Sequence, residues 1–365
     1  MPGENFGYEG VTIRVESQSA SDLAWMREFF HPWFDRSQAA PAVCVEYCVD
    51  PERFRQVYAQ GQRGAPVPLF MMDTHVIHHP LWSAPCQPHL IYEEDLCLFT
   101  RVDEQRVTVL AERRQPRSRV HLMRVVRELA MGAAQARGGR FLHASAVAMD
   151  GRAIVMIGRR MAGKTSLLTY LLANLDARLL TNDRLLVLEK SGNVELRGMP
   201  TIVSVRNSML PLFPALEEQI RRRHFTTRLT LEECRQADDS VFDNRHPDKK
   251  VLSPAQFCAA MSSGTERSAS AGVLLFPRQS GSPGGIELRR MSEAETLLAL
   301  EDGLFGHIGP DRLSGMFTLP MNRRKSTTDQ QFLEALATSS PAYQCSLGLQ
   351  AYESADGAEQ IGRLL

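Results

Sequence analysis

One short stretch of the sequence has the residue types and the spacing of a phosphate-binding loop. It begins at Gly158 and ends in Gly163-Lys164-Thr165, which matches the pattern G-x-x-x-x-G-K-[ST]. Backbone N–H groups in such a loop bind anionic oxygens, and the following helix adds partial positive charge at its N-terminus. The lysine can reach the outer phosphates, and the threonine hydroxyl can ligate Mg²⁺. The expected nucleotide-binding residues are Gly158, Arg159, Arg160, Met161, Ala162, Gly163, Lys164, Thr165 and Ser166.

The residues on either side support this interpretation. Residues 152–157 form an apolar run that predicts a buried strand, and Thr165 to Asn174 predicts an apolar helix. The alternative is a glycine-containing turn that binds nothing. A strand followed by a loop and then a helix favours the phosphate loop over that alternative.

A second candidate is Asn182-Asp183, which follows the next predicted strand, residues 177–181. If that strand runs parallel beside the strand of the phosphate loop, Asp183 lies at the edge of the sheet where ligands bind in such folds. Asp183 could then hold the metal or accept a proton from an attacking hydroxyl. The alternative is that the two residues only form a turn between strands.

A third candidate is His143, within a predicted strand that precedes the strand of the phosphate loop. A single histidine on a strand is more often structural than catalytic. Spacing alone therefore does not assign it a catalytic role.

Residues 140–206 resemble the catalytic core of HPr kinase/phosphorylase and its relatives. The resemblance rests on Leu142-His143-Ala144, on the loop 158–165 and on Asn182-Asp183, and residues 194–200 resemble the glutamate–aliphatic–arginine–glycine signature of that family. Segments 276–278, 288–292 and 340–343 are similar to the C-terminal part of HPr-kinase-related kinases. The similarity covers about the last two thirds of the chain.

This resemblance implies an α/β P-loop kinase domain of the HPr kinase and phosphoenolpyruvate carboxykinase type, with ATP and Mg²⁺ as cofactors. It implies that Asp183 activates the acceptor hydroxyl with help from His143, and that Thr165, Asp183 and Glu195 are metal-ligand candidates. The expected reaction moves the γ-phosphoryl group of ATP to a hydroxyl of an unidentified protein or small molecule.

The sequence departs from the family at two places. Asn182 stands where the family has a first acidic residue, and residues 1–115 do not resemble the regulatory domain of HPr kinases, so HPr is not the expected substrate. One alternative is a nucleotide-binding regulatory subunit with weakened catalysis. Another is a carboxykinase-like enzyme acting on a small organic acid, which would need further metal ligands.

Composition and length complete the expectations. The 365 residues predict about two domains: a small α+β domain over 1–115 and the kinase domain over 118–350, separated by the charged segment 113–117. Within the second domain, residues 118–137 predict a helix, and 224–265 form a polar stretch of weak periodicity. Residues 271–276 predict a strand ended by Pro277.

The formal net charge of zero gives no reason to expect nucleic-acid binding. No apolar run is long enough to cross a bilayer and the N-terminus is not a signal peptide, so the chain is expected in the cytoplasm without a membrane partner. It could form a homo-oligomer.

Two further kinds of segment give only weak signals of a functional site. A histidine- and cysteine-containing segment, 75–89, lacks the spacing of zinc sites, and the basic runs 221–224 and 323–325 are typical of solvated faces.

Overall fold

The computed structural model describes residues 1–72, 75–84, 87–103, 105–159, 161–190, 193–223, 249–304 and 329–365. These residues form two compact units, one made of residues 1–137 and the other of the described residues from 138 onward. The division follows Arg137, so the helix expected to open the second domain is grouped with the first unit.

The first unit contains a nine-stranded sheet with the order β3-β1-β2-β4-β9-β8-β7-β6-β5. Strands β2, β4 and β9 run parallel to one another, and the remaining neighbours in this sheet are antiparallel. The strands are β1 Gly3–Tyr8, β2 Val11–Ser17, β3 Asp35–Arg36, β4 Val43–Val49, β5 Gln62–Met72, β6 His75–Ala84, β7 Gln87–Glu93, β8 Leu98–Val102 and β9 Arg106–Ala111, and the helices are α1 Ala20–Phe30, α2 Pro51–Gln60, η1 Glu94–Leu96 and α3 Pro116–Ala136.

The sequence of β2 alternates as expected of a strand. Val11, Ile13 and Val15 of β2 are buried, as the period-two pattern predicts. Ser19 caps helix α1, because its side chain accepts a hydrogen bond from the Ser21 N–H. Asp50 caps α2 in the same way by accepting from the Arg53 N–H, with proline at the start of the helix.

The second unit is built on an eight-stranded sheet with the order β11-β10-β13-β14-β17-β19-β18, with β12 paired to β10. An additional pairing of β11 with β17 joins the first strand of that order to the fifth, so five strands form a closed ring. The strands are β10 Arg140–Met149, β11 Arg152–Ile157, β12 Arg178–Thr181, β13 Arg184–Lys190, β14 Asn193–Met199, β17 Ser268–Gln279, β18 Ile286–Arg290 and β19 Ala342–Leu347, and a separate two-stranded sheet pairs β15 Val203–Arg206 with β16 Lys249–Leu252.

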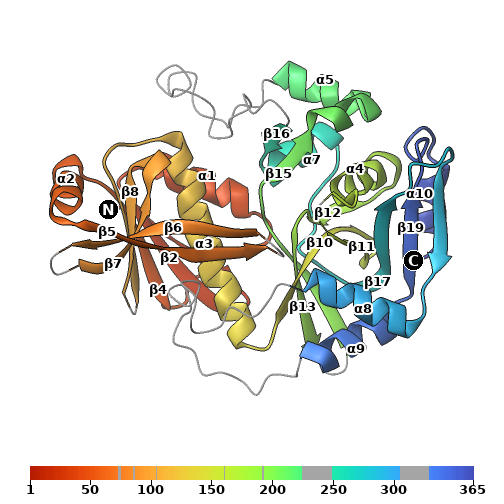
Figure 1. Cartoon of the computed structure of the whole chain (residues 1–365), viewed down its shortest axis with the longest axis horizontal. Helices are drawn as coiled ribbons and strands as arrows, with labels where there is room; N and C mark the ends of the chain where they lie inside the picture. The colour runs from red at the N-terminus through yellow and green to blue at the C-terminus, as the bar shows by residue number, and fades with distance from the viewer. Residues whose placement is uncertain are drawn as a thin grey trace. The chain divides into compact units, whose positions relative to one another are not determined.

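Helices lie on both sides of the ring of strands in the second unit (Figure 1). Helix α4 Lys164–Asn174 contacts β10 and β11, and α8 Glu293–Gly303 contacts the same two strands. The buried side chains of β10, β11 and β17 pack with α8 and α9 Asp329–Ser339 in one hydrophobic core. The other helices are η2 Asn207–Leu212, α5 Pro214–Arg223, α7 Pro254–Met261 and α10 Asp356–Gly362.

Most secondary structure expected from the sequence in this unit is confirmed, including the strand, loop and helix around the phosphate loop. Helix α8 begins with a capping box formed by Ser292 and Glu295. Two expectations are wrong. The polar stretch 224–265 contains β16 and α7 in its described part, and residues 224–248 lie outside the described residues. Strand β17 continues past Pro277 to Gln279, because its pairing with β19 continues on either side of the proline.

Candidate active site

Three parallel strands of the second unit end at the same edge of the sheet. Strand β11 is parallel to β17, and β17 is parallel to β19. Ligands of α/β sheets bind beyond the carboxyl ends of parallel strands. The loop that follows β11 is the sequence-predicted phosphate loop, so it lies at this edge.

The backbone of the loop is shaped for an anion. Met161 and Gly163 have φ angles of 73° and 101°, in the left-handed region, and alternation of this kind turns successive N–H groups toward one side. A Cβ at Gly163 would lie 2.8 Å from Gln279 Nε2 and 2.8 Å from Leu347 Cδ1. Both the φ angle and the contact explain why glycine occupies this position.

Helix α4 begins at this loop without a side-chain cap. Its N-cap residue is Gly163, which has no side chain to accept hydrogen bonds from the first turn. The first-turn N–H groups and the hydroxyls of the partly buried Thr165 and Ser166 can therefore meet a ligand. Such a helix start is suited to a phosphate group.

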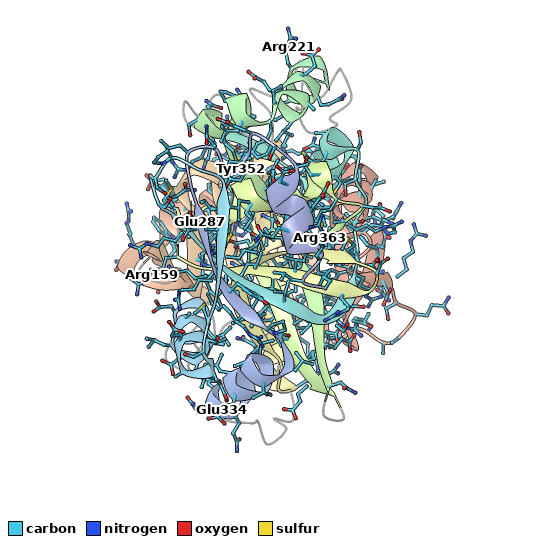
Figure 2. The ribbon with its side chains drawn as sticks, turned by 90° about the vertical axis from the view of Figure 1, so that its right-hand side faces the viewer. Arg159, Arg221, Glu287, Glu334, Tyr352 and Arg363 are labelled. Carbon is cyan, nitrogen blue, oxygen red and sulfur yellow. The ribbon has the colours of Figure 1, made fainter. Side chains whose placement is uncertain are left out.

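Lys164 is buried, and its ammonium group donates to the carbonyl oxygens of Gly158 and Arg159. The lysine thus ties together the beginning and the end of the loop. Lys164 therefore stabilises the loop in addition to the expected reach toward the phosphates, and its removal will also loosen the loop. Arg159 is exposed at the edge of the unit (Figure 2) and pairs with Asp302 of α8 at 2.9 Å.

The structure brings His143 and Asp183 together. His143 Nε2 lies 3.1 Å from Asp183 Oδ1. His143 is opposite Arg184 in the pairing of β10 with β13, and Asp183 immediately precedes β13. Arg184 is buried, with its Nε 3.8 Å from Asp183 Oδ2. The carboxylate therefore has two nitrogen-containing neighbours, and the sequence singled out only one of them.

The turn that carries Asp183 is fixed by hydrogen bonds from two directions. The Ser145 hydroxyl donates to Asn182 O at 2.7 Å, and the Ala144 N–H donates to Asp183 O at 3.2 Å. The Asn182 side-chain amide donates to Ile202 O at 3.0 Å and accepts from the Thr201 hydroxyl at 2.7 Å. Asn182 thus holds the backbone after β14, which is a structural task that a carboxylate could not perform in full because it has no N–H to donate.

Electrostatics relate the two parts of the site. Burial alone would raise the pKa of Asp183, but the hydrogen bond from His143 and the charges of His143, Arg184 and Lys164 together lower that pKa below its ordinary value. The lysine of the phosphate loop therefore acts on Asp183 through space. The carboxylate is ionised at neutral pH and available to a cation.

Two sequence expectations about the site need correction. The strand that precedes Asp183, β12, is not beside β11, because β10 lies between them and pairs antiparallel with both. The two outer strands nevertheless run in the same direction. Glu195 is not brought to Asp183: it pairs with Leu188 on β13, four residues beyond Arg184 and roughly 13 Å along the strand, and its carboxylate contacts Arg197 at 2.8 Å.

The remaining residues fit one Mg²⁺ ion better than a multidentate metal cage. Among the described residues, no group of three histidine, cysteine or acidic side chains could hold a metal. Mg²⁺ requires only one or two carboxylates when it also binds nucleotide phosphates and water. Among the described residues, the Asp183 carboxylate and the Thr165 hydroxyl could serve as protein ligands of such an ion.

Some candidates from the sequence cannot be placed. Arg160 and the segments that contain His224 and residues 323–325 lie outside the described residues, as do the side chains of most of segment 75–89. Arg221 is exposed and pairs with Glu218 on the same helix, which is typical of a solvated face.

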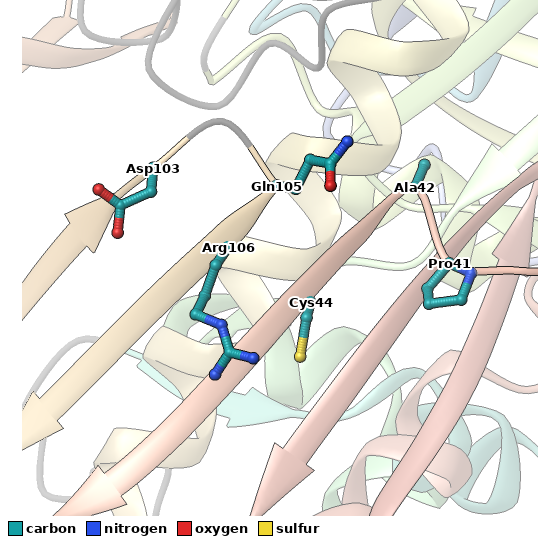
Figure 3. A pocket seen from close by; sticks show the side chains of 6 residues that line it. All are labelled: Pro41, Ala42, Cys44, Asp103, Gln105 and Arg106. Atoms are coloured by element: carbon teal, nitrogen blue, oxygen red, sulfur yellow. The ribbon is translucent and has the colours of Figure 1, made fainter.

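The first unit has a cavity of its own, of about 630 Å³, at the beginning of β4 and β9. Figure 3 shows Cys44 and Arg106 on these neighbouring strands, with Asp103 and Gln105 at the adjoining turn. The charged groups already have partners: Arg106 contacts Glu46 at 2.8 Å, and Asp103 contacts Arg101 at 2.9 Å. Burial and Glu16 raise the pKa of the Cys44 thiol, which makes it a poor nucleophile.

Comparison with known proteins gives no match to a family model and no match to a curated protein sequence. Within the described residues, no helix combines the length and the apolar character needed to span a membrane.

Proposed function

We propose that this chain is an ATP-dependent phosphotransferase of the HPr-kinase-like class, which moves the γ-phosphoryl group to a hydroxyl of a protein or small-molecule acceptor. The observation that carries the proposal is the loop before α4, where the uncapped helix start and the buried Lys164 form an anion site, while Asp183 lies 3.1 Å from His143 in the same unit. An anion-binding loop with an ionised carboxylate nearby is the basic requirement of phosphoryl transfer.

The residues have distinct roles in this proposal. Lys164 and the N–H groups of the loop bind the phosphates, and Mg²⁺ neutralises charge when it is bound by Thr165 and Asp183. The acceptor oxygen forms a bond to the γ-phosphorus while the bond from phosphorus to the bridging oxygen breaks, releasing ADP. The acceptor proton passes to the Asp183 carboxylate, and His143 orients that carboxylate through its Nε2 contact.

The low pKa of Asp183 bears on its role. A carboxylate that is held ionised is a weak base, so it accepts the proton late, when the bond to phosphorus has largely formed. Before that point it serves to orient the acceptor hydroxyl and hold the cation.

The reaction is proposed to occur in the cytoplasm, where thiols such as Cys44, Cys258 and Cys345 stay unpaired, as they are here.

A second candidate is a nucleotide-binding regulatory subunit with weakened catalysis, and Asn182 is the observation in its favour. The family resemblance would place a carboxylate at position 182. The chain has Asn182 there, and the amide of Asn182 is hydrogen-bonded to Thr201 and Ile202. In that case ATP would bind without transfer.

The two candidates are separated by incubating the purified chain with γ-labelled ATP, Mg²⁺ and cell lysate resolved into protein and small-molecule fractions. Transfer of label to an acceptor that depends on the added chain is expected. Binding of ATP with no labelled acceptor in either fraction would favour the regulatory subunit. No binding of ATP would contradict both.

A further inference from the structure

Gln279 is the last residue of β17, and its side chain lies against the phosphate loop. Strand β17 runs parallel to β11, so both strands end at the edge of the sheet where the loop begins. A Cβ at Gly163 would lie 2.8 Å from the side-chain nitrogen of Gln279 and 3.8 Å from its amide carbon. The amide group of Gln279 therefore packs beside the residue that immediately precedes Lys164.

A second side chain packs against the same glycine and differs from Gln279 in polarity and burial. Leu347 of β19 is the register partner of Gln279, and its Cδ1 would also lie 2.8 Å from a Cβ at Gly163. Leu347 is buried, whereas Gln279 is exposed. The apolar side chain thus fills the space inside the unit, and the amide lies at the surface of the loop, where a ligand can reach it.

Alternation along β17 gives the direction of the Gln279 side chain. Phe276 packs in the hydrophobic core with α8 and α9, so Gln279, three residues later, lies on the opposite face of the sheet. Ala144 of β10 belongs to the same core, which places His143 on that opposite face as well. Gln279 and His143 therefore project from the same face, on the two strands that flank β11.

The amide of Gln279 is oriented by the Tyr352 hydroxyl. Burial raises the pKa of that hydroxyl above its ordinary value, and side-chain hydrogen bonds with Gln279 and Ser166 oppose the rise. A hydrogen bond that opposes the rise is donated to the hydroxyl oxygen, so it comes from the amide nitrogen of Gln279. This nitrogen carries two hydrogens, and one bond to the hydroxyl leaves the second hydrogen for an acceptor on a ligand.

We propose that Gln279 is a phosphate-binding residue of the nucleotide site, whose amide nitrogen donates a hydrogen bond to the phosphates held by the loop. The backbone N–H groups of such a loop bind the α- and β-phosphates, and its lysine reaches the β- and γ-phosphates. The position beside Gly163 assigns the amide to the phosphates that ATP and ADP share. This inference rests on the proposed function, since it needs a nucleotide at the loop.

The test titrates MgATP and MgADP by calorimetry into the unmodified chain, Gln279→Met and Gln279→Glu, with melting curves to show that each is folded. Gln279→Met keeps the length of the side chain without the donor, so we expect about tenfold weaker binding of both nucleotides, the loss of one hydrogen bond to a charged group. Gln279→Glu places a carboxylate beside the phosphates, so we expect binding of both to weaken by at least about a hundredfold.

Gln344→Glu is the matched control, because it makes the same change on β19, three residues before Leu347. Arg289 donates to the side-chain oxygen of Gln344 at 2.7 Å, so a carboxylate is accommodated at this position. We expect this variant to bind both nucleotides within about twofold of the unmodified chain, as loss of no phosphate contact implies.

Three results would overturn the inference. Unchanged affinities in Gln279→Met and Gln279→Glu would mean that the amide does not contact the nucleotide. A loss confined to MgATP would contradict the contact with the shared phosphates, and an equal loss in Gln344→Glu would reduce the effect to one of net charge. Failure of the unmodified chain to bind either nucleotide is recognisable separately, because it would contradict the proposed function together with this inference.

Discussion

The two units each contain three parallel strands, but the helices that follow those strands are capped differently at their N-termini. In the first unit, β2 leads to α1 and β4 leads to α2, and the side chains of Ser19 and Asp50 cap these helices. Helix α3, which follows β9, begins with Pro116, which has no N–H to satisfy. In the second unit, α4 follows β11 through Gly163, with no side-chain cap.

The difference in capping determines which helix start can bind an anion. A helix N-terminus attracts anions only if its N–H groups are not already occupied by the protein itself. The first unit uses its own oxygens for that purpose, and the charged groups near its cavity are paired with each other. The second unit leaves the helix start open and places a buried lysine beside it.

The largest expected effect concerns the internal pairing of the first unit. Asp22 in the first turn of α1 is buried, and it contacts Arg119 at 2.7 Å and Arg114 at 2.8 Å. Asp22→Ala would leave the buried Arg119 without its carboxylate, so we expect a loss of about 3–5 kcal/mol in the free energy of unfolding. Chemical denaturation measures this loss.

The control for that prediction is Asp103→Ala in the same unit. Asp103 forms an exposed pair with Arg101, and such pairs contribute about 0–1 kcal/mol. Equal losses for the two variants would mean that burial does not distinguish these ion pairs.

Replacing the carboxylate of the second unit tests catalysis instead of stability. Asp183→Asn keeps the shape of the side chain but cannot take a proton or hold a cation as well, so we expect phosphoryl transfer to fall by at least about a hundredfold. His143→Ala should cost less, because His143 orients the carboxylate without replacing it. Single-turnover transfer from γ-labelled ATP measures both, and a wild-type rate for Asp183→Asn would favour the regulatory subunit.

A smaller effect follows from the lowered pKa of Asp183. A carboxyl whose pKa is lower in the folded protein than in the unfolded chain stabilises the fold above its unfolded pKa. That contribution is lost as the pH falls through the folded value, which here lies below the ordinary 3.8. The difference in unfolding free energy between the unmodified chain and Asp183→Asn should therefore shrink below about pH 4; a difference independent of pH from 7 to 3 would contradict the assignment of this shift.

The strand–loop–helix conformation of residues 152–174 could be predicted from the sequence because its signal is local. Strand, glycine positions, lysine and helix lie within one short segment, and the structure has each of them where the pattern predicts. The capping box at Ser292 is local in the same sense. Short-range signals of this kind depend on backbone geometry that neighbouring residues determine.

The surroundings of Asp183 could not be predicted in the same way, because they depend on strand order and register. The sequence did not indicate that β10 lies between β11 and β12, and this order is what brings His143 to Asp183. The register of β13 and β14 places Glu195 opposite Leu188, away from Asp183. Arg184 gave no signal beyond its proximity in sequence, since a buried arginine is recognised only when its environment is known.

The most direct test of the account is calorimetric titration of MgATP into the unmodified chain, Lys164→Ala and Arg106→Ala, with melting curves to show that each is folded. We expect one ATP site per chain and equal affinity in Arg106→Ala of the first unit. Affinity should be at least about a hundredfold weaker in Lys164→Ala, because a buried charge-assisted contact with phosphate is lost. Affinity in Lys164→Ala equal to that of the unmodified chain would contradict the assignment of the nucleotide site to the phosphate loop.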